Sequence, residues 1–181
     1  KPGVRGRAAD AGLLNAGKKE SQDICFVPDG NIRDALIRLS HYTPCSGVFT
    51  DRNGYVIGTH SGAAAYTVGQ RRGPGISSDR RLYVIKKNIA DNSVVLGPEE
   101  DLYSRSFDIT DVSLTGMEKF IHDIHCTVMI RYNSREYDAV ISPTGDNTAH
   151  VCASVGIRAV TPGQACVFYN GEYVLGGGII K

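Results

Sequence analysis

The sequence predicts a mainly β protein with a few short helices, in which a small central β-rich domain precedes a six-stranded antiparallel β-barrel. Glycine makes up 21 of the 181 residues, a content typical of chains with many tight turns. Two turn signals, Asn53-Gly54 and Asp91-Asn92, each separate two strand-like apolar runs. After residue 104, six short apolar segments alternate with turn sequences, which is the pattern of a small closed barrel.

Two short helices are expected before the first strand. Pro2 near its start and Gly12 beyond its end bracket the first helix. Asn31 can cap the second, because its side-chain oxygen can accept a free backbone N–H, and Pro44 lies beyond the end. The apolar residues of this second helix recur at helical spacing: Ile32, Ala35, Leu36 and Leu39.

The strands are expected in a regular series. In the central domain, two hairpins are predicted at 47–50 with 55–58 and at 82–86 with 93–96. The polar run 97–101 is the expected domain boundary. The barrel strands are predicted at 107–114, 125–132, 135–141, 150–153, 165–169 and 173–180, with turns that include 143–147 and 169–171.

Composition and charge narrow the classes of function. Hydrophobic residues make up 41% of the chain, which is enough for a packed core and argues against disorder. The 20 Lys and Arg residues nearly balance the 19 Asp and Glu residues, so the net charge is only +1. A global field that attracts nucleic acid is therefore absent, and any RNA site must be a local patch.

Five cysteines form no CxxC pair and are odd in number, which favours a reducing compartment over a disulfide framework. The sequence shows no signal peptide and no apolar run long enough to span a membrane. We therefore expect a soluble cytoplasmic protein. Cys126, Cys152 and Cys166 lie in apolar strand patterns and are expected to pack in the core, whereas Cys45 is expected in a loop.

Cys25 lies between Ile24 and Phe26, directly after a polar and charged run. A cysteine reacts as its thiolate, so its reactivity depends on local charge and exposure. The lysines before it would favour the thiolate, whereas Glu20 and Asp23 would disfavour it. On residue types alone, the favoured interpretation is a small buried hydrophobe at the start of a strand.

Several further blocks accompany Cys25 in a fixed order. They are 18–26 (KKESQDICF), 58–62 (GTHSG), 66–73 (YTVGQRRG), Arg131-Tyr132, 160–164 (VTPGQ), 168–172 (FYNGE) and 175–180 (LGGGII). Together they cover essentially the whole chain, and they resemble the tRNA-specific 2-thiouridylases, the MnmA/TrmU family.

The resemblance implies the C-terminal half of a larger enzyme, because the family's N-terminal ATP-pyrophosphatase motifs do not occur in this sequence. Residues 1–25 would be the tail of that missing domain and would carry the cysteine segment. Residues 26–103 would form the central domain, and 104–181 a barrel like those of translation-factor domains. This half alone is expected to be inactive, since the ATP site lies elsewhere.

The resemblance also implies a reaction. The complete enzyme would make 2-thiouridine at the wobble position of tRNAs for Lys, Glu and Gln, using ATP, magnesium and a sulfur-donor protein. Cys25 would carry a persulfide, a stronger nucleophile than a thiol, whose outer sulfur attacks the ATP-activated uridine. A second thiol of the missing domain would then release the sulfur as a disulfide forms.

In the family, the positions matching Arg131, Tyr132 and Gln164 contact tRNA. An arginine beside an aromatic ring offers a phosphate clamp and a stacking face. From the residues alone, a strand-end pair that packs on the barrel rim is an equally open interpretation.

Arg71 and Arg72 lie in the glycine-rich loop 69–75. Guanidinium groups next to glycines can approach phosphates closely, so we expect this loop to help position tRNA or the Cys25 segment. An ordinary solvated turn is the alternative. Pro74 stands where relatives usually have Leu, and it would stiffen the loop.

No metal is expected, because His122, His125 and Cys126 lack the paired ligand spacing of a zinc site. The run Gly176-Gly177-Gly178 is expected to mark a bulge or a close backbone approach in the last strand.

A second interpretation is a non-catalytic β-barrel RNA-binding module in which Cys25 is only structural. The Cys25 block favours the enzyme, because a binding module has no need of such a segment outside its barrel. A cysteine hydrolase is discounted, since no histidine with a supporting motif accompanies the cysteine.

Overall fold

The fold is that of a computed structural model, which describes residues 2–13, 17, 35, 37–39, 43–115, 120–132 and 134–181. The chain divides into two compact units, residues 1–44 and 45–181. Cys25 lies outside the described residues.

The first unit contains the predicted N-terminal helix, α1 (Pro2–Asp10). Gly12 adopts a left-handed conformation with a φ of 68°. Around it, the N–H of Leu13 donates to the carbonyl of Ala8 at 3.0 Å and the N–H of Gly12 to that of Ala9 at 2.9 Å, which is the hydrogen-bond pattern of a glycine-terminated helix. This confirms the predicted end of the first helix.

Ala35 and residues 37–39 are helical, in the region predicted for the second helix. Its expected cap, Asn31, lies outside the described residues. No helix in the part of the chain that the structure describes is both long and apolar enough to cross a membrane.

The second unit begins with a four-stranded sheet. Its strands are β1 (Gly47–Thr50), β2 (Val56–His60), β3 (Tyr83–Asn88) and β4 (Ser93–Gly97), in the order β2-β1-β4-β3. Both predicted hairpins are confirmed, since β1 pairs antiparallel with β2 and β3 with β4. The hairpins join through a parallel pairing of β1 with β4, which the turn signals do not reveal. One face buries Phe49, Val84, Val94 and Leu96.

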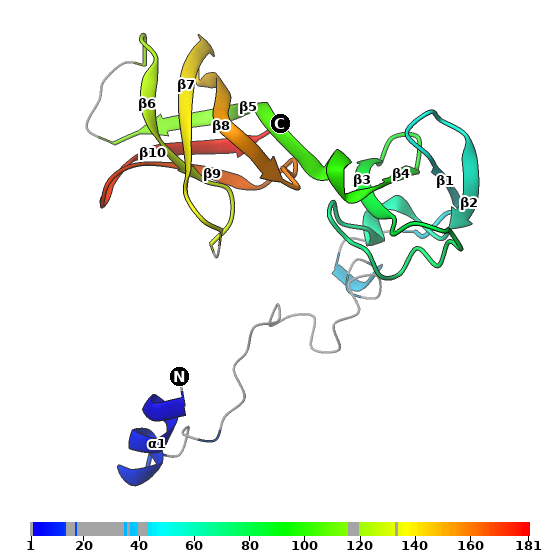
Figure 1. Cartoon of the computed structure of the whole chain (residues 1–181), viewed down its shortest axis with the longest axis horizontal. Helices are drawn as coiled ribbons and strands as arrows, with labels where there is room; N and C mark the ends of the chain where they lie inside the picture. Colours follow the sequence, from blue (N-terminus) through cyan, green and yellow to red (C-terminus); the bar gives the residue numbers. More distant parts are fainter. Residues whose placement is uncertain are drawn as a thin grey trace. The chain divides into compact units, whose positions relative to one another are not determined.

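The second half of this unit is a closed six-stranded barrel, as predicted, with the strand order β10-β5-β8-β7-β6-β9 (Figure 1). Every pairing in it is antiparallel. The strands are β5 (Tyr103–Leu114), β6 (Ile124–Met129), β7 (Tyr137–Gly145), β8 (Thr148–Arg158), β9 (Ala165–Asn170) and β10 (Tyr173–Ile180). Its interior is filled by apolar side chains that include Val128, Ile141, Val151 and Phe168.

Several predicted strand limits are wrong, among them that of β8, which spans Thr148–Arg158 rather than the predicted 150–153. β7 runs through Pro143 to Gly145, because its pairing with β8 continues to Thr148, so the turn is shorter than 143–147. β5 begins at Tyr103, which pairs with Arg158, rather than at residue 107. β6 ends at Met129, so Arg131 and Tyr132 lie in the bend beyond the strand.

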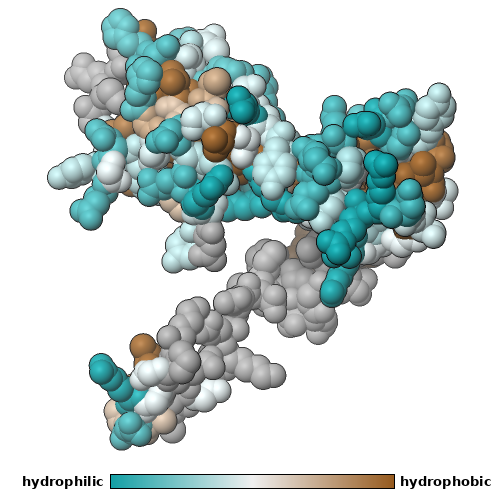
Figure 2. All heavy atoms as spheres, in the orientation of Figure 1, coloured by the Kyte–Doolittle hydropathy of each residue, from teal (hydrophilic) through white to brown (hydrophobic). Residues whose placement is uncertain are grey.

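A small core joins the four-stranded sheet to the barrel. Val68, Tyr83, Leu102 and Ala159 are buried together. At its edge, Arg158 Nε lies 3.3 Å from Glu99 Oε1, and its guanidinium lies over the Tyr83 ring, 5.7 Å from the centroid. On the face seen in Figure 2, apolar side chains are scattered among polar ones, as is usual for protein surfaces.

The glycine run in β10 is a close backbone approach, as predicted. Gly176 has a φ of 155°, and an added Cβ would collide with the Ser113 carbonyl of β5. The register of β10 shifts in both of its pairings, between Val174 and Gly176 against β9 and between Gly177 and Ile179 against β5. The barrel seam therefore needs residues without side chains at this point.

Gly176→Ala should lower the free energy of unfolding by about 2–5 kcal/mol, because it adds backbone strain to overpacking against β5. Gly171→Ala is the matched control: its φ is 58°, but nothing lies within 4 Å of the added Cβ, so about 1–2 kcal/mol of strain is expected. Urea unfolding of both variants measures the difference. Equal losses would contradict this account of the seam.

Candidate functional site

Arg131, Tyr132 and Gln164 lie together at one end of the barrel. Arg131 follows β6 and Gln164 precedes β9, and these strands are neighbours. Arg131 Nε donates to Gln164 Oε1 at 3.2 Å, while the Tyr132 side chain is 94% exposed. The three residues line one hollow of about 560 Å³ together with Met129, Ala165, Val167 and Tyr169.

Arg131 is also held by the backbone. Its Nη2 donates to the Ala159 carbonyl at 2.6 Å and to Thr161 Oγ1 at 3.3 Å. Charge-assisted hydrogen bonds of this kind are stronger than neutral ones. Each of the two interpretations of this pair therefore fits one residue: Arg131 is packed on the barrel rim, whereas Tyr132 has an exposed ring that could stack on a base.

Two hydrogen bonds of the Gln70 side chain hold the loop 69–75 together. The backbone N–H of Thr67 donates to Gln70 Oε1 at 3.0 Å, and Gln70 Nε2 donates to the Arg72 carbonyl at 2.7 Å. Arg71 and Arg72 are both exposed. The loop is therefore an ordered, solvent-facing turn that presents two cations.

Arg80 and Arg81 add to this charge. With Arg71 they line a polar hollow of about 320 Å³. In the part of the chain that the structure describes, none of these three guanidinium groups has a carboxylate within 4.0 Å. Arg80 and Arg81 were not among the site residues predicted from the sequence; the signal that could have revealed them is the Arg-Arg pair just before the strand that follows the loop.

The block 58–62 is structural in this fold. His60 is buried, its Nδ1 accepts the N–H of Gly62 at 3.0 Å, and its ring packs edge-on against Phe49 at 4.8 Å between centroids. Burial lowers the pKa of His60, so the neutral ring is favoured. The His60 ring therefore packs in the core of the sheet beside Phe49 rather than offering a free base.

The cysteines of the barrel differ in exposure. Cys166 is buried, and burial raises its pKa to about 12, while partial burial raises the pKa of Cys126 to about 11. Cys152 is exposed, so the prediction that it packs in the core is wrong. It alternates along β8 with Val151 and Ala153, which face the interior, and it therefore points outward.

Cys45 is exposed in an irregular segment before β1, as predicted. The Asn92 side-chain amide lies 3.2 Å from its sulfur and 3.1 Å from its carbonyl oxygen. Asn92 Oδ1 also accepts the N–H of Ala63 at 2.8 Å. Cys45 is therefore part of the packing that joins the start of β1 to the turn before β4, the two central strands of the sheet.

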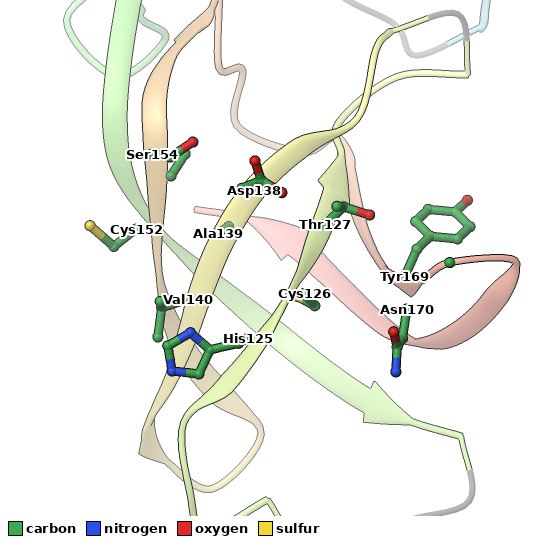
Figure 3. A pocket seen from close by; sticks show the side chains of 12 residues that line it. His125, Cys126, Thr127, Asp138, Ala139, Val140, Cys152, Ser154, Tyr169 and Asn170 are labelled. Carbon is green, nitrogen blue, oxygen red and sulfur yellow. The ribbon is translucent and has the colours of Figure 1, made fainter.

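A larger hollow of about 580 Å³ lies on the outer face of β6, β7 and β8 (Figure 3). His125, Val140 and Cys152 follow one another across the three strands, and Thr127 pairs with Asp138 further along. No group of three metal-ligating side chains occurs among the described residues. The hollow is a shallow outer surface of the barrel with mixed polarity.

Two family models match successive parts of the chain. Residues 39–98 match the model of the tRNA methyl transferase PRC-barrel domain, and residues 104–180 match that of the aminomethyltransferase beta-barrel domain.

Full-chain relatives are named tRNA-specific 2-thiouridylase MnmA. The chain is 44% identical to the protein of Halothermothrix orenii over 98% of its own length and 50% of the relative. It is 40% identical to MnmA 1 of Caldanaerobacter subterraneus over 98% and 49%, and 41% identical to the protein of Heliobacterium modesticaldum over 99% and 47%. The chain thus spans about half the length of the curated relatives it matches.

Thiol labelling at pH 8 should separate the cysteines by burial. With a pKa of about 11 to 12, Cys126 and Cys166 hold at most roughly one thiolate in a thousand at that pH, whereas the sulfur atoms of the exposed cysteines are accessible to the reagent. Iodoacetamide followed by peptide mass spectrometry should therefore modify Cys45 and Cys152 first. Labelling in urea, where all thiols react, is the control. Equal rates for Cys166 and Cys152 in the folded protein would contradict this packing.

Proposed function

Since this chain belongs to the family of tRNA-specific 2-thiouridylases, we propose that it is the sulfur-carrying and tRNA-facing half of a tRNA-uridine 2-sulfurtransferase. The observation that carries the proposal is similarity along 98% of the chain to enzymes of that name. The complete enzyme would act on the wobble uridine of tRNAs for Lys, Glu and Gln, with sulfur supplied by a donor protein.

Cys25 is the proposed sulfur carrier. Bound ATP, with magnesium, would supply activation of the uridine 2-oxygen, and we assign its site to the half of the enzyme that this chain does not cover. The outer sulfur of the Cys25 persulfide would form a bond to C2 of the base as the adenylated oxygen leaves with AMP. A second thiol would then attack the Cys25 sulfur, so that a disulfide forms and the transferred sulfur stays on the base.

The described residues supply the proposed RNA surface. A net charge of +1 requires that phosphate binding be local. Arg71 and Arg72 are exposed on an ordered loop with Arg80 and Arg81 nearby, and exposed cations of this kind release counterions from RNA on binding. At the barrel end, the open ring of Tyr132 can stack on an unpaired base. By itself this half is expected to bind tRNA but not to thiolate it.

A non-catalytic RNA-binding module is the second candidate. It is favoured by one observation: the loop cations and the Tyr132 hollow lie on residues 45–181, whereas Cys25 does not. The two candidates predict the same RNA binding. They differ in whether Cys25 accepts sulfur.

Arg71→Glu/Arg72→Glu should weaken binding of a tRNA-Lys transcript by about tenfold or more and flatten its salt dependence by about one to two units of slope, because two phosphate contacts are lost. Fluorescence anisotropy across a salt series measures both quantities. Arg105→Glu/Lys181→Glu makes the same change in net charge at two other exposed sites and should have a much smaller effect. Equal effects of the two double variants would contradict a local site.

Cys25→Ser should abolish sulfur loading. The chain, with Cys45 and Cys152 replaced by Ser to remove the exposed described thiols, is incubated with a cysteine desulfurase and cysteine, and intact mass is measured. One reducible sulfur adduct is expected with Cys25 and none with Cys25→Ser, because only an accessible thiolate accepts the sulfur. If the full-length enzyme with Cys25→Ser accepts sulfur as well as the wild type does, Cys25 is not the sulfur carrier and the chain is better described as a non-catalytic RNA-binding module.

A further inference from the structure

We propose that the turn formed by residues 158–161, here called the Ala159 turn, is the positioning element of the tRNA-facing surface, and that Arg131 acts by holding this turn. The inference rests on the proposed function. It assigns positioning roles to Thr161 and Gly69 as well.

On the barrel side, hydrogen bonds converge on one carbonyl. The Ala159 oxygen accepts from Arg131 Nη2 at 2.6 Å and from Thr161 Oγ1 at 2.8 Å. Thr161 Oγ1 in turn accepts from Arg131 Nη2 at 3.3 Å. Arg131 Nε donates to Gln164, so Nη1 is the guanidinium nitrogen without a hydrogen-bond partner among the described residues. Three of the five N–H donors of Arg131 are therefore used to hold the protein itself.

The backbone of the turn is unusual for alanine. Ala159 has a φ of 54°, in the left-handed region, and is 1% exposed. A non-glycine residue in this region carries strain that the surrounding structure must offset. The bonds from Arg131 and Thr161, together with the N–H of Ala159 donating to the Leu102 carbonyl at 2.7 Å, supply that support.

On the side of the central sheet, the basic loop rests on the same turn. Gly69 opens the loop with a φ of 89°, and a Cβ added to it would lie 3.1 Å from the Cβ of Ala159. The N–H of Gly69 donates to the Val84 carbonyl at 2.8 Å, and the N–H of Val84 to the Gln70 carbonyl at 2.9 Å. The first two loop residues are therefore fixed between β3 and the Ala159 turn.

These contacts link the two groups proposed to bind RNA, the loop arginines and Tyr132, through the Ala159 turn. Arg71 and Arg72 follow directly from the anchored residues, and Tyr132 is next to Arg131 in the chain. A change at the Ala159 turn would therefore move the loop cations and the Tyr132 ring together. Such alignment lets one tRNA engage both groups without further ordering of the protein.

The decisive comparison is Arg131→Lys against Arg131→Met. If Arg131 is a positioning residue, both should weaken tRNA-Lys binding to a similar extent, about five- to tenfold, because neither side chain restores the fork of bonds to Ala159 and Gln164. The salt slope should stay that of the wild type. If Arg131 contacts phosphate instead, Arg131→Lys will retain most of the affinity and Arg131→Met will flatten the slope by about one; that result overturns the proposal.

Thr161 provides a milder test with a matched control. Thr161→Val removes both hydroxyl bonds with little change in shape and should weaken binding about threefold, whereas Thr161→Ser should bind like the wild type. Thr144→Val also removes one hydroxyl contact, the 3.0 Å bond to Thr148, but lies away from the turn and should have no effect on binding. Equal binding by Thr161→Val and the wild type counts against the proposal.

A measurement without RNA separates this inference from the proposed function. In ¹H–¹⁵N NMR spectra, Arg131→Lys and Thr161→Val should shift the Gly69 amide, whereas Thr144→Val should not. An unmoved Gly69 amide overturns the coupling, whatever the tRNA results. If the amide moves but neither the loop arginines nor Tyr132→Ala affects tRNA binding, the turn does couple the two domains and the proposed RNA-binding role fails instead.

Discussion

Closure of the barrel is the constraint on which the remaining structure depends. β10 pairs with β9 on one side and with β5 on the other, and the glycine run at 176–178 allows these backbones to approach. Because the circuit is closed, β6 and β9 remain neighbours. Arg131 and Gln164, which are 33 positions apart in the chain, are thereby held within hydrogen-bond distance. The strand pairing of the barrel therefore sets the geometry of this rim.

The small core between the sheet and the barrel fixes part of the four-stranded sheet against the barrel. Tyr83 of β3, Leu102 and Ala159 exclude water together, and Arg158 closes the edge through Glu99 and the Tyr83 ring. A partly exposed ion pair contributes little by itself, so the apolar contact is the principal connection. The basic loop begins at this core, which explains how an exposed, glycine-rich segment can have a defined position.

Reactive cysteine chemistry and RNA binding are assigned to different parts of the chain. The described cysteines of the barrel interior are kept as thiols by burial, so they are poor nucleophiles. The cations and the open aromatic ring lie on loops and strand ends, where they can meet a polyanion. In the proposed function this surface positions RNA, and the proposed sulfur carrier belongs to a different segment. Binding and sulfur transfer would therefore be separable by mutation.

The sequence by itself determined the helix end at Gly12, both hairpins, the six-stranded barrel and the backbone approach at Gly176, because turn chemistry and strand alternation are local signals. It also determined the family, through the ordered blocks of residues that begin with the Cys25 segment. Only the tertiary structure decided that β1 lies parallel to β4, that Cys152 faces outward, and that Arg80 and Arg81 join the loop cations. It also decided that Arg131 is bound to the Ala159 carbonyl. Each of these depends on which distant segments meet and which strand face turns inward, and pairing across the fold sets both.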